Sequence, residues 1–527
     1  MSAGYDVVVV GGGHNGLVAV FDLARAGLRT LVLERRPVVG GAAVTDEIHP
    51  GFRVPTLAHA TGPIRPDVVR DMQLERHGLT TIEADPRVFA PSADGGALVL
   101  YTDAARSAEA IARLSRKDAE SYRTFQRVLG ETAKALRPLL DLTPPSVDGL
   151  SAADLRGLIP ALWRARGLGV KGAMRLARWA PMSAADLAEE WFETDVLRAV
   201  VAARGVFGTF LGPMSAGTGA VLLLRAASDP HPAGPASFVK GGTGALTAAM
   251  AVAAREAGAE IRTRAEVARI VIKGGEVAGV ALASGEEIHA KTVVSNADPQ
   301  RTLLRLVDPV HLEPGFLSRL RGYMCRGALA KVNLALAEQP RFTVANDGDA
   351  VLRGRIHIGP DVAYIERAFD DAKHGEPSRR PYLEATIPSL TDPTLAPAGR
   401  HVMSVYVQYA PFTLKQADWA SRREALGDAV VETLAAHAPN LPRAVLARQV
   451  LTPQDLEAEY GLTGGHPFHG ELALDQLFLA RPLLECARYR TPIRGLFLCG
   501  AGTHPGNGLT GASGRNAARE IRRALRR

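Results

Sequence analysis

The residues from Tyr5 to Gly16 have the sequence YDVVVVGGGHNG, and Glu34 follows eighteen residues after Gly16 at the end of a second apolar run. The β-branched run before the glycines is typical of a buried parallel strand. The glycine-rich turn would open a helix that ends near Gly27. A strand, a glycine turn, a helix, a second strand and a terminal acid make up a dinucleotide-binding βαβ unit. We therefore expect a Rossmann-like domain.

Each glycine of this turn has its own expected role. Gly11 permits the tight turn, Gly13 lets the backbone approach a pyrophosphate, and Gly16 lets the helix pack closely on the strand. The pyrophosphate would lie at the positive end of the helix dipole. Glu34 would accept the two hydroxyls of an adenosine ribose and would repel a 2′-phosphate, which favours FAD or NAD over NADP.

Two further glycine-rich stretches predict cofactor contacts. Gly40-Gly41 allows a tight turn beside a cofactor, and the small residues after it leave room. The stretch from Gly500 to Gly508 precedes a helix and would direct backbone N–H groups at an anion, which suits a reduced flavin and which an NAD enzyme does not need. FAD is therefore the expected cofactor. The further candidate cofactor residues are His14, Asn15, Glu34, Arg35, Gly40, Gly41, Ala42, Ala43, Thr45, Gly500, Gly502, Thr503, Gly508, Leu509 and Thr510.

The composition of the chain narrows its class. A length of 527 residues predicts two or more domains, and a net charge of +7 over so large a surface does not indicate a nucleic-acid partner. Cys325, Cys486 and Cys499 form no Cys-x-x-Cys pair, which argues against a flavin–disulphide reductase and favours buried, inert thiols. No signal peptide and no run of eighteen apolar residues is visible, so we expect a cytoplasmic protein.

Strand–turn–helix sequence occurs at the start, in the middle and at the end of the chain, separated by two long insertions. This pattern predicts an α/β fold, α+β overall, in which a Rossmann-like FAD-binding domain is built from residues 1–75, 232–305 and 480–527. The insertions, residues 76–231 and 306–479, would form a substrate domain. The first insertion is mostly helical, and its prolines at 144, 145, 160 and 181 are expected to divide it into separate helices. The second mixes helices with β-sheet.

Three stretches resemble the phytoene desaturase-like FAD oxidoreductases, a branch of the amine-oxidase superfamily. They are the first glycine turn with Gly40-Gly41, the stretch from Gly241-Gly-Thr-Gly-Ala-Leu246 to Ser295-Asn-Ala-Asp298, and Leu498-Cys-Gly-Ala-Gly-Thr-His-Pro-Gly506. The resemblance covers most of the chain and is loose in the helical insertion. It implies bound FAD, a p-hydroxybenzoate-hydroxylase-like architecture, a substrate that is often apolar, and a backbone contact of Val267 with adenine. Departures at His14-Asn15 and around His469 argue against a carotenoid substrate.

The densest polar group before the last glycine-rich stretch supplies the candidate catalytic residues, which are His466, His469, Asp475 and Arg481. They would line a substrate cavity or form an interdomain hydrogen-bond network, and both interpretations stay open. The expected reaction is dehydrogenation of a C–C or C–N bond of a hydrophobic or amphipathic small molecule by hydride transfer to flavin N5, with oxygen or a quinone as acceptor. The alternatives are a flavin-dependent saturase or isomerase of a polyene or lipid-like substrate, and a non-catalytic FAD-stabilised scaffold.

The stretch from Arg156 to Met182 is basic, has no acidic residue and contains Trp163 and Trp179. Such helices would touch an anionic membrane surface, which would place the protein at the inner face of the membrane, or form a solvated lid of the substrate domain. The oligomeric state is also open, with a homodimer as one possibility.

Overall fold

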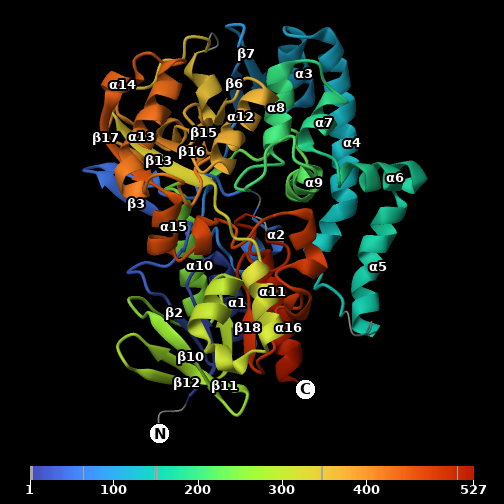
Figure 1. The fold of residues 1–527 in the computed structure, drawn as a ribbon, viewed down its shortest axis with the longest axis vertical. Coiled ribbons are helices and arrows are strands. Elements are labelled where there is room, and N and C mark those ends of the chain that lie inside the picture. The colour runs from blue at the N-terminus through green and yellow to red at the C-terminus, as the bar shows by residue number, and fades with distance from the viewer. Residues whose placement is uncertain are drawn as a thin grey trace.

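The computed structural model describes residues 4–526 except 63, 147–148, 150–151, 346–347 and 507. Two seven-stranded sheets organise the molecule, one in its lower half and one in its upper half as drawn in Figure 1. Most helices of the first insertion stand beside the upper sheet, and both chain ends lie at the bottom of the same view. The fold is therefore α/β, with mixed sheets, as predicted.

The lower sheet brings together three widely separated parts of the chain. Its strand order is β10-β11-β12-β1-β2-β9, and β18 pairs with β12. β1 runs parallel to both β2 and β12, and β18 runs parallel to β12. The strands are β1 (Tyr5–Val10), β2 (Thr30–Leu33), β9 (Glu260–Arg262), β10 (Val267–Lys273), β11 (Glu276–Leu282), β12 (Glu287–Ser295) and β18 (Leu496–Leu498).

Three helices cover one face of the lower sheet, and each follows a predicted glycine-rich turn. They are α1 (His14–Ala24), α10 (Thr243–Glu256) and α16 (Ala512–Leu525), and α1 packs against the other two. Gly27 ends the α1 segment with φ of +84°, a left-handed conformation that favours glycine. The opposite face is covered by the π-helix Arg301–Leu306 and by α11 (Pro314–Gly322), which belong to the same apolar cluster as Val8 and Val293.

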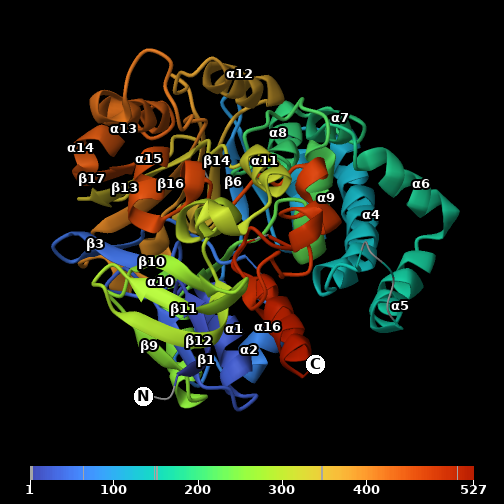
Figure 2. The same cartoon turned by 60° about the horizontal axis from the view of Figure 1, so that its bottom comes forward.

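The upper sheet has the order β17-β13-β16-β15-β14-β6-β7. Its long central pair, β13 and β16, is antiparallel and almost wholly buried. The helices α12 (Val362–Lys373), α13 (Trp419–Ala435) and α14 (Leu441–Ala444) lie in the same half of the molecule (Figures 1 and 2). The strands are β6 (Val88–Pro91), β7 (Ala97–Leu100), β13 (Leu329–Leu336), β14 (Arg355–Ile358), β15 (Tyr382–Thr386), β16 (His401–Gln408) and β17 (Val445–Leu451).

Short elements connect the two halves. The hairpin of β3 (Thr45–His49) and β4 (Phe52–Pro55) packs against β13, β16 and β17 of the upper sheet and against α10. A second pair, β5 (Thr81–Glu83) with β8 (Ser237–Val239), leads into α10. α2 (Pro66–Asp71) and α15 (Pro453–Tyr460) complete the junction.

The described residues of the first insertion form the helices α3 to α9 besides β5, β6 and β7, and the divisions between the helices differ from those expected. Pro160 lies inside α5, because one proline removes a single backbone hydrogen bond and the helix continues past it. Pro181 follows α6 directly, whereas Pro144 and Pro145 lie between α4 and α5. The helices are α3 (Ala104–Ala112), α4 (Arg116–Leu140), α5 (Ala152–Arg166), α6 (Gly169–Trp179), α7 (Ala184–Glu189), α8 (Asp195–Ala203) and α9 (Thr218–Ser228).

Two predictions from composition also have a structural outcome. Cys325, Cys486 and Cys499 are buried free thiols, and burial raises the pKa of each above its ordinary value. Their burial was expected, and it keeps the thiols protonated at neutral pH. Among the helices of the described residues, none has the length and apolarity needed to cross a membrane.

Candidate active site

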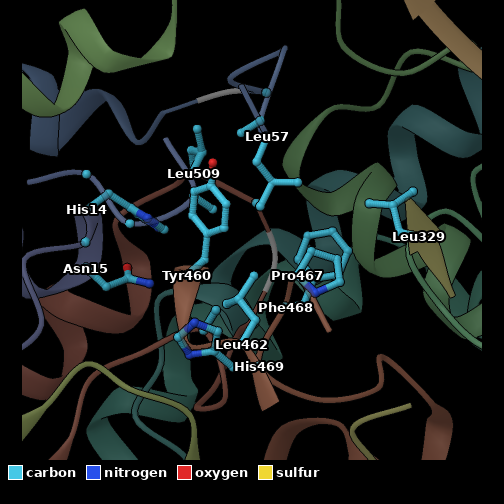
Figure 3. Close-up of a pocket in the computed structure, with 18 of the residues that line it drawn as sticks. His14, Asn15, Leu57, Leu329, Tyr460, Leu462, Pro467, Phe468, His469 and Leu509 are labelled. Atoms are coloured by element: carbon cyan, nitrogen blue, oxygen red, sulfur yellow. The ribbon is translucent and has the colours of Figure 1, made fainter. Parts of the chain in front are cut away.

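A continuous cavity runs from the glycine turn after β1 to the upper sheet. Fourteen of the predicted site residues line it. Figure 3 shows His14 and Asn15 on one side and Leu329 on the opposite side, with Tyr460, Phe468 and His469 between them. The predicted residues in its wall are Gly11, Gly13, His14, Asn15, Glu34, Arg35, Gly40, Gly41, Ala42, Val267, His469, Gly508, Leu509 and Thr510.

The glycine turn is held in shape by side chains around it. The backbone N–H of Gly12 donates to Glu34 Oε2 at 2.8 Å, and the N–H of Arg36 donates to Glu34 Oε1 at 2.9 Å. A Cβ at Gly13 would lie 2.7 Å from Asn296 Nδ2, and one at Gly16 would lie 2.5 Å from the carbonyl oxygen of Gly11. Gly16 therefore allows the close strand–helix packing that was predicted for it.

The residues present fit a flavin dinucleotide. Glu34 stands beside the turn, at the position of a ribose-binding acid, and Glu266, Val267 and Arg301 continue the wall from there. Gly508, in the last glycine-rich turn, also lines the cavity. A Cβ at Gly508 would meet no atom within 4 Å, so this turn borders open space. His14 and His469 line this region, and His14 Nε2 and His469 Nδ1 are buried ring nitrogens without a hydrogen-bond partner among the described residues.

His14 and His469 are both neutral at physiological pH. Burial lowers the pKa of His14 to about 4, an effect that His469 reinforces and that a hydrogen bond with the Gly508 backbone opposes. Burial likewise lowers the pKa of His469 to about 3, with Arg481 and His466 acting in the same direction. A neutral imidazole offers one donor and one acceptor, so each ring can hydrogen-bond a cofactor or substrate group.

The backbone of His469 is held in an uncommon conformation. Its φ is +58°, which non-glycine residues adopt rarely and which often marks a functional segment. The hydroxyl of Tyr323 donates to the His469 carbonyl at 3.0 Å, and the His469 N–H donates to the carbonyl of His466 at 3.2 Å. Hydrogen bonds on both sides therefore keep the imidazole at the cavity wall.

The other three candidate catalytic residues lie outside the cavity wall. Asp475 is exposed on the short 3₁₀ helix Leu474–Gln476, so its expected place in the cavity is wrong. His466 is buried, accepts at Nδ1 from the N–H groups of Phe468 and Gly470, and has Nε2 3.8 Å from a carboxylate oxygen of Glu471. Asp475 is therefore exposed to solvent, whereas His466 is buried and makes its hydrogen bonds within the loop.

Arg481 has a structural role at the same loop. Its guanidinium is fully buried and donates to the carbonyl of Glu471 at 2.7 Å, of Phe468 at 2.8 Å and of Ala501 at 2.8 Å. These bonds tie the loop that carries His469 to the last glycine-rich turn. Arg481 thus forms a hydrogen-bond network between the loop and the turn, whereas the contacts of His466 stay within the loop.

Several predicted cofactor residues lie outside the cavity wall, where they hydrogen-bond to the backbone of neighbouring segments. The Thr503 hydroxyl donates to the Gly500 carbonyl at 2.8 Å, and Thr45 Oγ1 accepts from the Gly244 N–H at 3.0 Å. His504, considered as a chemical participant, has Nε2 2.7 Å from the carbonyl of Leu139. The predicted residues outside the wall are Gly16, Ala43, Thr45, Gly500, Gly502 and Thr503.

The sequence interpretation missed a buried polar group beside the substrate end of the cavity. Lys331 on β13 is fully buried, with Nζ 2.8 Å from His59 Nδ1 and 3.7 Å from the ring centroid of Tyr406. Burial lowers the pKa of Lys331 well below its ordinary value. His59 Nε2 lies 3.6 Å from Glu384 Oε1. A lysine in the apolar run ALAKVNLAL was the available signal.

Known proteins are similar to this chain over most of its length. The family model for flavin-containing amine oxidoreductases matches residues 194–522, and a model for an NAD(P)-binding Rossmann-like domain matches residues 9–72. The chain is 39% identical to pyridine nucleotide-disulfide oxidoreductase domain-containing protein 2 of Rattus norvegicus, over 99% of this chain and 94% of that protein. It is 28% identical to the hydroxyneurosporene desaturase of Cereibacter sphaeroides, over 98% of this chain and 97% of that protein.

Solved structures show the same fold. An oxidoreductase from Methanosarcina mazei superposes with a TM-score of 0.63 at 17% identity, over 98% of this chain and 99% of that one. A putrescine oxidase variant gives a TM-score of 0.62 at 17% identity, with the same coverage.

Proposed function

Because the chain belongs to the family of flavin-containing amine oxidoreductases and is an FAD-dependent oxidoreductase, we propose that it dehydrogenates a C–C or C–N bond of a hydrophobic or amphipathic small molecule. The observation that carries the proposal is the continuity of the cavity, which joins the dinucleotide turn at Gly11 and Glu34 to a chamber of apolar side chains. When bound, FAD accepts the hydride that the substrate loses.

The chamber is suited to an apolar substrate. Leu57, Phe207, Leu329, Tyr406, Leu462 and Phe468 line it, and Phe207 makes edge-on ring contacts with Tyr406 and Phe468. Such a wall binds an apolar body by burial and keeps water from the reacting carbon. The substrate is then oriented by the few polar groups that reach the same space.

We assign the substrate-side positioning to His469. It lines the cavity next to Phe468, and its imidazole is neutral. A neutral ring nitrogen can accept a hydrogen bond from a substrate N–H and can take up its proton as the hydride leaves the neighbouring carbon and a C=N bond forms.

Two alternatives share the same cavity. A saturase or a redox-neutral isomerase of a polyene or lipid-like substrate would use reduced FAD, and a scaffold would bind FAD without turnover. Anaerobic photoreduction followed by oxygen, a quinone and unsaturated compounds separates them. Oxygen or quinone reoxidation supports the proposed dehydrogenase, and reoxidation by an unsaturated compound alone supports the saturase. No reoxidation supports the isomerase if the reduced protein converts a polyene, and the scaffold if it does not.

The same proposal extends to location. We propose a cytoplasmic protein, built from the FAD-binding segments 1–75, 232–305 and 480–527 with the rest as substrate domain, that touches the inner face of a membrane through α5 and α6. These helices project from the body in Figures 1 and 2. They expose Leu155, Ile159, Leu162, Trp163, Val170 and Met174 among basic residues. Apolar side chains within a basic surface suit an anionic bilayer.

A further inference from the structure

Arginines gather where the cavity is formed by α8, α9 and the upper sheet. Arg204, Arg225 and Arg355 line it there, together with two carboxylates, Asp229 and Glu384. Charged side chains are uncommon in a cavity with apolar walls, because burial of an unpaired charge costs free energy. Each of these five charged side chains is therefore expected to have a partner of opposite charge or a hydrogen-bond partner.

Both carboxylates already have arginine partners. Glu384 Oε2 lies 2.5 Å from Arg355 Nη1, and Asp229 Oδ2 lies 3.0 Å from Nη1 of Arg87, which stands just behind the wall. Four arginines, Arg204 included, and two carboxylates give a local charge of 4 − 2 = +2. Neighbouring histidines add nothing to this charge, since burial lowers the pKa of His231 to about 3 and of His357 to about 4.

Arg225 is the cation with the fewest partners. Its Nη2 donates to the carbonyl of Phe207 at 2.6 Å, whereas its Nε is buried and has no hydrogen-bond partner. Within the described part of the chain, no carboxylate oxygen comes within 4.0 Å of its guanidinium. Arg204, by contrast, donates to the carbonyls of His231 and Asp229.

Arg225 also marks the border between the charged and the apolar parts of the cavity. Its guanidinium carbon lies 5.3 Å from the ring centroids of both Phe207 and Phe468. Phe468 precedes His469, the residue assigned to the reacting end of the substrate. A molecule with its apolar body against these rings would therefore place a terminal group beside Arg225.

We propose that Arg225, assisted by Arg355, binds the anionic head group of an amphipathic substrate whose apolar body lies along Phe207 and Phe468. An arginine fork matches a carboxylate or a phosphate, and an incoming anion supplies the charge that Arg225 lacks. The Nε of Arg355 is likewise buried without a hydrogen-bond partner and can add a second donor. The inference rests on the proposed function and names the class of its substrate.

The test compares three ten-carbon probes with the FAD-loaded protein in a calorimeter: decanoate, decanol and decyl phosphate. We expect at least one anion to bind about tenfold or more tightly than decanol, because an anion makes charge-assisted hydrogen bonds with the guanidinium and the neutral alcohol does not. The anion that binds more tightly identifies the head group. Equal affinity of decanol and both anions overturns the proposal.

Variants locate the effect. Arg225→Met removes the cation and is expected to reduce the affinity of the preferred anion to that of decanol, whereas Arg422→Met, an exposed control, leaves both affinities unchanged. Glu384→Gln removes the charge that pairs with Arg355 and is expected to raise anion affinity several-fold. This second variant tests the head-group site if Arg225→Met does not fold. The proposal is overturned if the preference for an anion over decanol is the same in Arg225→Met, in Glu384→Gln and in the parent protein.

The readout also separates this inference from the proposed function. A protein that holds FAD, oxidises apolar amines or alkenes and shows no anion preference contradicts the head-group site alone. A protein whose reduced FAD no acceptor reoxidises contradicts the proposed dehydrogenase, whatever its affinity for decanoate. Calorimetry measures binding without turnover, so the two results are independent.

Discussion

The imidazole of His469 stands against Gly500, so that a Cβ at position 500 would lie 2.9 Å from His469 Nδ1. The two residues belong to the loop before β18 and to the turn after it, which Arg481 ties together through the carbonyls of Phe468 and Ala501. The last glycine-rich turn thus shapes the substrate side of the cavity. A side chain at position 500 would displace the ring that we assign to substrate positioning.

Replacing His469 tests that assignment. His469→Ala is expected to lower kcat by about a hundredfold while FAD content and melting temperature stay close to those of the parent, because a positioned acid–base group contributes about 10²–10⁴ in rate. Asp475→Asn is the matched control, since Asp475 belongs to the same segment and is exposed. The assignment fails if the two variants retain equal turnover, or if His469→Gln restores no more activity than alanine.

Replacing Glu34 tests the ribose-binding acid. Glu34→Arg removes the acceptor of the Gly12 N–H and puts a cation where two ribose hydroxyls are expected. We expect FAD affinity to fall by about tenfold to a hundredfold, the equivalent of one charge-assisted hydrogen bond. FAD per folded chain, measured by absorbance after gel filtration, gives the answer. Full occupancy in this variant would remove Glu34 from the cofactor site.

Stability should depend on pH through buried histidines. Burial lowers the pKa of His14, His357 and His504 to about 4 and of His59, His231 and His469 to about 3. Below about pH 6.5 the unfolded chain binds protons on these residues and the folded chain does not, so the free energy of unfolding falls as the pH falls from there toward these folded-state values.

Thermal unfolding between pH 7.5 and 5 measures this loss. Each such histidine contributes about 1.4 kcal/mol per pH unit once the unfolded form is protonated. His504→Asn keeps a donor for the Leu139 carbonyl and removes one titrating group, so its melting temperature should depend less steeply on pH. A melting temperature that rises from pH 7 to pH 5 would contradict the assignment of these histidines as neutral.

The exposed face of α5 and α6 should bind anionic vesicles. We expect co-sedimentation with vesicles that contain phosphatidylserine, weakened by salt, because each lysine or arginine near such a surface contributes about 1 kcal/mol. Val170→Ser should reduce binding, and Val310→Ser is its matched control, since the two valines are 78% and 79% exposed on different elements. Binding that ignores lipid charge, or equal loss in both variants, favours the solvated lid.

Local sequence was enough to predict the elements of the cofactor site. The strand before the first glycine turn, the helix that ends near Gly27 and the strand that ends before Glu34 were expected, and the structure has them as β1, α1 and β2. The apolar patterns and the glycines that end these elements lie within a few residues of each other, so interactions between neighbouring residues determine the elements. Pro160 was misjudged for the same local reason, since its cost is offset by the rest of α5.

What the sequence by itself determined was therefore the dinucleotide-binding unit, its preference for FAD and the three-part order of the chain, because glycine turns and buried strands depend on neighbouring residues. Only the tertiary structure decided which polar residues face the cavity. Asp475 and His469 are six residues apart, yet one is exposed and the other lines the wall, while Arg225 reaches the wall from a distant element. Their burial and their partners come from contacts between segments far apart in the chain, which no local pattern encodes.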